Sequence, residues 1–179
     1  GIQVEKCSYV QNDSLEDNED MEALYNIIEK KDNKPVITAN FLTANPDFKK
    51  IKESGFTSYF NESIDETILN RPNSGKVKDL YTQGQKAGFF IPQLHGREHL
   101  NISRWMTDLQ NNNEETRLAF ELGVFGISNN VVKQKRWSYQ AAFDKVENDF
   151  GISRVNILKD AVEDFERMFG FKSITFIAP

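Results

Sequence analysis

The chain has 179 residues, about the size of one domain, so it can bury one sizeable hydrophobic core. Hydrophobic residues make up 39% and charged residues 27% of the sequence, and this balance excludes disordered, collagen-like and disulfide-rich proteins. The net charge is -5 and no long basic run is present, so we expect no nucleic-acid partner. The strongest apolar stretch, Ala87 to Leu94, is far shorter than the about 20 residues that span a bilayer, so we expect no membrane partner either.

Cysteine content and the first residues bear on the compartment. Cys7 is the only cysteine, so no internal disulfide can form, and we expect a cytoplasmic protein. No segment near Gly1 has the charged and then apolar pattern of a signal peptide, and Gly1 is not a methionine. We therefore expect that residues upstream of Gly1 have been removed.

Two helix-to-strand units are predicted in the first half of the chain. Apolar residues at helical spacing predict a helix from Glu19 to Lys31 with Asn18 as its N-cap. Pro35 to Leu42 then resembles a strand that is buried on both faces. A second helix starts at Ser74 and is ended by Gly88, and Phe89 to Leu94 is the next strand.

The remaining segments continue the alternation of helices and strands. Residues 45–73 are too apolar for a plain loop, and we expect a partly helical excursion over one end of the sheet. Further helices are predicted at 98–110, 114–122, 139–150 and 155–169, with a weak strand at 124–127 and a last strand at 174–177.

Helices that alternate with apolar strands predict an α/β fold with parallel strands and outer helices. Four strands are too few for a closed eight-unit barrel, which needs about 250 residues. We therefore expect residues 1–179 to form a single, incomplete (β/α) barrel domain whose first and last strands are missing. Its open sheet edges predict self-association.

The two histidines, His95 and His99, lie four residues apart after the second predicted strand. In parallel α/β folds, the side chains that act on ligands gather at the carboxyl ends of the strands. His99 follows His95 by one helical turn, so both imidazoles can face one divalent metal ion, and zinc suits such ligands. Spacing alone does not identify the third ligand that a catalytic zinc site needs.

Two other interpretations of this segment stay open. His95 can hydrogen-bond a backbone carbonyl at the rim of the sheet while His99 lies on a helix surface, without any metal. Residues 95–99 also match the H-x-x-E-H pattern of zinc metallopeptidases, with Glu98 as general base. That pattern needs one helix through both histidines, which Pro92 and Gly96 oppose.

Polar and aromatic residues near the same rim are candidates for substrate binding. Asn40 lies near the end of the first predicted strand and Asn45 lies after it. Arg97 and Glu98 lie between the two histidines. Trp137 precedes a predicted helix, and its ring can stack on a sugar. The alternatives are a surface ion pair for Arg97 and Glu98, worth about 0 to 1 kcal/mol, and core packing for Trp137.

Three segments, TANFLTANPDF (38–48), PQLHGREHLN (92–101) and FIAP (176–179), resemble the polysaccharide deacetylase-like family. The resemblance spans most of the chain, and HGREHLN is its most specific part. It implies a distorted (β/α) barrel in which an aspartate and an H-x-x-x-H pair hold a divalent metal, usually zinc. His95 and His99 match that pair. It also implies removal of acetyl groups from N-acetyl sugars, with an aspartate as general base and a later histidine as acid.

The chain departs from that family in its catalytic residues. The family's aspartate pair lies on the first barrel strand and its catalytic histidine on a late strand, and neither strand has a counterpart here. We therefore assign no catalytic residue and expect the chain alone to be inactive as a carbohydrate deacetylase. The alternatives are a non-catalytic carbohydrate-binding or interaction module and the zinc metallopeptidase.

Overall fold

The computed structural model describes residues 3–128, 139–146 and 153–179. Trp137 and residues 147–150 of a predicted helix lie outside these ranges. No helix in the described part of the chain is long and apolar enough to cross a bilayer. The elements in chain order are η1 (Val4–Lys6), α1 (Ser8–Asn12), α2 (Asn18–Glu29), β1 (Ile37–Leu42), β2 (Ala44–Pro46), α3 (Phe48–Glu53), β3 (Asn61–Ser63), α4 (Ile64–Asn70), α5 (Val77–Lys86), β4 (Phe90–Gly96), α6 (Ile102–Gln110), α7 (Glu114–Glu121) and α8 (Arg154–Phe169).

The central sheet contains the first two predicted strands. β1 and β4 pair in parallel, with Asn40 opposite Gln93 and Phe41 opposite Leu94. On the other edge of β4, Leu94 forms a single parallel bridge with Phe176. The parallel pairing of an α/β fold is thus confirmed, while the described strands form two two-stranded sheets and the barrel stays a prediction.

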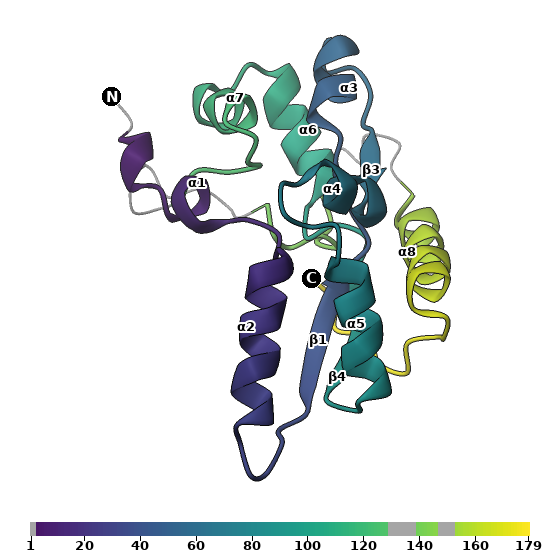
Figure 1. The fold of residues 1–179 in the computed structure, drawn as a ribbon. Coiled ribbons are helices and arrows are strands. Elements are labelled where there is room, and N and C mark those ends of the chain that lie inside the picture. The colour runs from purple at the N-terminus through teal and green to yellow at the C-terminus, as the bar shows by residue number, and fades with distance from the viewer. Residues whose placement is uncertain (1–2, 129–138, 147–152) are drawn as a thin grey trace.

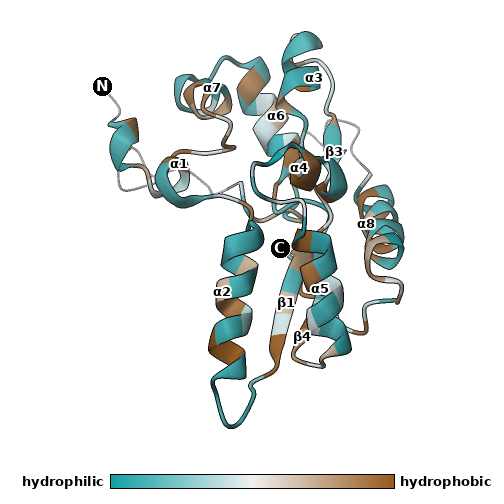
Figure 2. Ribbon diagram, viewed as in Figure 1, coloured by the Kyte–Doolittle hydropathy of each residue, from teal (hydrophilic) through white to brown (hydrophobic). Residues whose placement is uncertain are grey.

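One face of the β1–β4 sheet is apolar and covered by helices. Phe41, Phe90 and Leu94 on that face belong to a buried cluster with residues of α2, α5 and α8. Figure 1 shows α2 and α5 running alongside the strands, and Figure 2 shows hydrophobic and hydrophilic residues alternating along α2. Burial of this apolar surface is the main force that holds the helices to the sheet.

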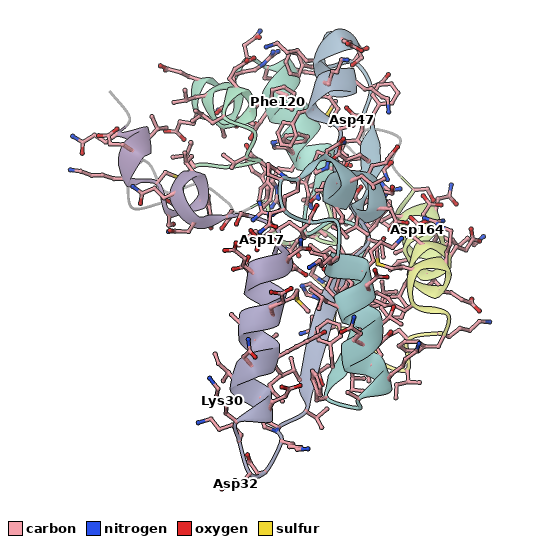
Figure 3. The ribbon with its side chains drawn as sticks, viewed as in Figure 1. Asp17, Lys30, Asp32, Asp47, Phe120 and Asp164 are labelled. Atoms are coloured by element: carbon pink, nitrogen blue, oxygen red, sulfur yellow. The ribbon has the colours of Figure 1, made fainter. Side chains whose placement is uncertain are left out.

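The helix α2 begins one residue earlier than predicted, and its cap is Asp17 rather than Asn18. The Asp17 carboxylate accepts from the backbone N–H groups of Glu19 and Asp20, and Asp20 completes a capping box. Asn18 instead accepts from the backbone N–H of Lys76 at the start of α5. Figure 3 shows Asp17 at this end of α2 and Asp32 in the turn beyond its other end.

Residues 45–73 form the predicted excursion at the carboxyl end of β1, with α3, β3 and α4 (Figure 1). The excursion packs against α6 and α7 in a second buried cluster. Phe120 on α7 points into this cluster (Figure 3), where its ring lies 5.0 Å from that of Phe48 and 5.7 Å from that of Trp105. The partly helical excursion is therefore confirmed.

Several predicted elements differ in the structure. Residues 124–127 form no strand, and residues 174–177 contribute only the bridge at Phe176. β1 has an exposed face, at Thr38 and Asn40, and is not buried on both faces. The helix predicted for 139–150 is absent over the described residues 139–146.

The side chain of Asn101 explains the missing helix over residues 139–146. Its amide donates to the backbone carbonyls of Ala141 and Asp144, and its own N–H donates to the carbonyl of Tyr139. The Ala141 carbonyl also accepts from the backbone N–H of Asp144, so residues 139–146 form turns that are tied to Asn101. The segment supports the start of α6, where Asn101 is the N-cap.

Candidate functional site

His95 is the last residue but one of β4, and its side chain shares a face of the sheet with Gln93 because side chains alternate along a strand. Its Nδ1 lies 2.8 Å from the backbone oxygen of Ile177. A carbonyl oxygen only accepts, so Nδ1 carries the proton of this bond. In the neutral ring the lone pair is then on Nε2, which is the atom left to bind a metal ion.

His99 lies in the turn between β4 and α6 and not on a helix, so the predicted helical position is wrong. The turn nevertheless brings the two imidazoles together, with ring centroids 4.9 Å apart and ring planes at 66°. Nδ1 of His99 is buried and has no hydrogen-bond partner among the residues that the structure describes. Because an unpaired buried nitrogen is costly, a metal ion at this atom would offset that cost.

Oγ1 of Thr43, just after β1, is a second buried polar atom without a hydrogen-bond partner in the described part of the chain. The backbone N–H of Thr43 lies 3.1 Å from the carbonyl oxygens of both Gly96 and Arg97. The loop after β1 is thus bonded to the loop that carries His99. Both loops lie at the carboxyl ends of the parallel strands, where α/β folds bind ligands.

Arg97 and Glu98 form a buried ion pair rather than a surface pair. Only 9% of the Arg97 side chain and 3% of the Glu98 side chain are exposed. Nε of Arg97 lies 2.8 and 2.9 Å from the two Glu98 oxygens, and Nη1 lies 2.7 Å from Asp160 of α8. These polar groups already have protein partners, and substrate binding by Arg97 and Glu98 stays a prediction.

Tyr59 adds a third contact to this ion pair, because its hydroxyl donates to Glu98 over 2.7 Å. Burial, and then the Glu98 charge, raise the pKa of Tyr59 well above its usual value, so Tyr59 remains a donor. Burial lowers the pKa of Arg97, but the charge and hydrogen bond of Glu98, together with Tyr59 and the hydrogen bond to Asp160, raise it, and the net change is upward. The contacts of Tyr59, Arg97 and Asp160 join three distant segments around the turn that holds His99.

Asn40 and Asn45 line a separate pocket of about 780 Å³ beside β1. Residues before α2 and after α7, together with Glu62 and Thr67, form other parts of its wall. The Asn45 amide donates to Thr67 over 3.2 Å, while Asn40 is exposed. Neither histidine lines this pocket, so the structure divides the predicted site residues into two groups.

The metallopeptidase pattern lacks its required helix in this structure. His95 belongs to β4, His99 to a turn, and α6 begins only at Ile102. The Glu98 carboxylate, which would be the base, is bonded to Arg97 and Tyr59.

The described ranges contain no group of three or more His, Cys, Asp and Glu side chains that could hold a metal ion. The third ligand thus stays unassigned.

Thr43, Tyr59 and Gln93 were not predicted as site residues from the sequence. Gln93 had a detectable signal, because polar residues alternate with apolar ones at Gln93 and His95 as they do at Thr38 and Asn40. Thr43 and Tyr59 lie in loops, where no periodic pattern marks them. Only their contacts reveal their position.

Comparisons with models of protein families, with curated proteins and with solved structures find no match for this chain.

Proposed function

We propose that His95 and His99 bind a divalent metal ion, zinc, in a hydrolase similar to the polysaccharide deacetylases, whose substrates are N-acetylated sugars. The observation that carries this proposal is the pair of imidazoles, 4.9 Å apart, with a buried and unpaired Nδ1 on His99. Imidazole nitrogens are preferred zinc ligands. The pair also lies at the end of a parallel strand, where the fold class places ligand sites.

A bound zinc ion would polarise the acetamide carbonyl and lower the pKa of a water molecule. The role of this chain in the proposed reaction is to hold the metal. The Ile177 carbonyl orients His95, and the Arg97–Glu98 pair fixes the turn before His99. No general base is assigned among the described residues. We therefore infer that this chain binds metal and sugar but releases no acetate by itself.

Calorimetric titration with zinc chloride tests the metal site. We expect the wild-type chain to bind zinc and His95→Ala and His99→Ala each to weaken it at least about tenfold, equivalent to about 1.4 kcal/mol. Gln83→Ala, on the exposed side of α5, is the control and keeps the wild-type affinity. Equal zinc binding by all four proteins would contradict the site.

The pocket at Asn40 and Asn45 favours a second candidate, a carbohydrate-binding module without catalysis. A cavity of about 780 Å³ is within the usual size range for small ligands, which is roughly 300 to 1,000 Å³. Binding of N-acetylglucosamine oligomers, measured with zinc and with a chelator, separates the two candidates. Binding that needs zinc and is lost in His95→Ala supports the hydrolase. Binding that survives the chelator and is lost in Asn45→Ala supports the module.

We further infer a cytoplasmic location, on the basis of the single cysteine, and self-association through open edges of the fold. Among the described residues, β1 has a strand partner on one edge only. Exposed apolar side chains, including Ile174 and Phe176, add surface that a second copy can cover.

A further inference from the structure

The C-terminal residues Ser173 to Pro179 lie along the edge of β4 that is opposite β1. Phe176 forms a β-bridge with Leu94. The Pro179 ring packs on Gly96, and a Cβ atom added at Gly96 would lie 3.0 Å from Cγ of Pro179. Figure 1 shows the chain end close to the carboxyl end of β1. This segment therefore reaches the rim that carries both histidines.

Apolar burial contributes little to holding this segment in place. Ile174 is 88% exposed, Ile177 51% and Phe176 45%. Side chains that stay largely in water gain little from the hydrophobic effect. Polar contacts must therefore set the position of the segment on β4.

Gln93 provides most of these polar contacts. Its side chain is buried, and Oε1 lies 3.2 and 3.0 Å from the backbone nitrogens of Ile174 and Thr175. The hydroxyls of Ser173 and Thr175 lie 3.0 and 2.8 Å from the same oxygen. The Gln93 amide group donates to the carbonyl of Pro92 over 2.7 Å, which fixes the orientation of the side chain. One buried oxygen thus accepts from two backbone N–H groups and the Thr175 hydroxyl, and the Ser173 hydroxyl shares its single proton between this oxygen and the Thr175 carbonyl, 2.7 Å away.

The same segment supplies the hydrogen-bond partner of His95. The Ile177 carbonyl, two residues beyond Thr175, lies 2.8 Å from Nδ1 of His95. A carbonyl on Nδ1 selects the tautomer whose lone pair is on Nε2 and orients the ring. If the segment left β4, His95 would lose this partner.

We propose, on the basis of the metal site proposed above, that Gln93 is a positioning residue for His95. Through Ser173 to Thr175 it places the Ile177 carbonyl on Nδ1 and so presents Nε2 to the metal. Gln93 itself touches neither the metal nor the substrate.

The test replaces Gln93 by Met, which keeps the length of the side chain and removes the oxygen. Nitrogen-edited NMR of the metal-free protein, at about pH 8, where imidazole is normally neutral, reports which nitrogen of each histidine carries the proton. The chain has only two histidines, so the spectrum is simple. We expect His95 to be protonated at Nδ1 in the wild type and to become a mixture of tautomers in Gln93→Met. Zinc affinity falls about tenfold, the lower end of the loss known for outer-shell partners of metal ligands.

One variant controls for the chemistry of the substitution. Gln83→Met makes the same change on the exposed side of α5 and alters neither the His95 tautomer nor the zinc affinity. Thr175→Val removes one donor to Gln93 Oε1, and we expect a smaller shift of the His95 tautomer. This variant tests the positioning role if Gln93→Met does not fold. An unchanged His95 tautomer in the folded variants overturns the positioning role.

The two proposals fail in different ways. If the tautomer shifts in Gln93→Met while the wild type binds no zinc, the metal site is wrong and Gln93 still positions His95. If zinc binds but the tautomer is the same in wild type and Gln93→Met, the metal site stands and the role of Gln93 is overturned.

Discussion

The two faces of the β1–β4 sheet differ in chemistry although alternate residues of the same strands form both. On one face Phe41 and Leu94 pack against α2, α5 and α8. The other face is polar. Asn40 lines the pocket, Gln93 contacts the C-terminal segment, and His95 lies next to the imidazole of His99. Because the side-chain period of a strand is two, the apolar and the polar side chains are neighbours in sequence and can be changed separately.

The largest effect is expected for Phe41→Ala on the apolar face. The Phe41 ring lies 5.2 Å from the ring of Tyr81 and 4.9 Å from that of Phe169, measured between centroids. Its removal leaves a cavity between β1, α5 and the end of α8, and we expect the free energy of unfolding to fall by about 3–5 kcal/mol. Urea unfolding followed by circular dichroism measures this loss. A loss below about 1 kcal/mol would show that this face does not carry the stability of the sheet.

A smaller loss is expected for Gly84→Ala, which tests how closely α5 approaches the same face. A Cβ atom at Gly84 would lie 2.7 Å from Cβ of Phe90 and even closer to the Tyr25 hydroxyl. That hydroxyl donates to the carbonyl of Leu80 over 2.6 Å, so it cannot move freely. We expect the free energy of unfolding to fall by about 1–3 kcal/mol from overpacking.

Gly75→Ala is the matched control for Gly84→Ala. A Cβ atom at Gly75 has no atom within 4 Å, and its φ is not positive. Its free energy of unfolding should change by less than about 0.5 kcal/mol. Similar losses in the two variants would mean that close packing at Gly84 is not the cause.

Local patterns predicted the helices that are held by an apolar face. The spacing of apolar residues located α2, α5, α6, α7 and α8 to within a few residues, because burial of one face governs each of them. The parallel pairing of β1 with β4 followed from the intervening helices. The sequence placed His99 one helical turn after His95, whereas in the structure a non-helical turn brings the two rings together.

Features that depend on residues far apart in sequence could not be predicted in this way. The Arg97–Glu98 pair is buried because Tyr59 and Asp160, 39 and 63 residues from their partners, close over it. The helix predicted at 139–150 is lost over 139–146 because Asn101 pairs with the carbonyls of that segment. In each case a tertiary hydrogen bond outweighs the local preference.

The smallest change in stability is expected for Asn40→Ala, one residue from Phe41 on the opposite face. The Asn40 side chain is exposed and lines the pocket, so its loss should change the free energy of unfolding by less than about 0.5 kcal/mol. If the polar face binds sugars, binding of N-acetylglucosamine oligomers should weaken several-fold, because a hydrogen bond contributes about 1 kcal/mol. Asn70→Ala, at the exposed end of α4, is the control and should affect neither quantity. A large loss of stability with unchanged sugar binding would reverse the roles assigned to the two faces, since Asn40 would then support the fold rather than a ligand.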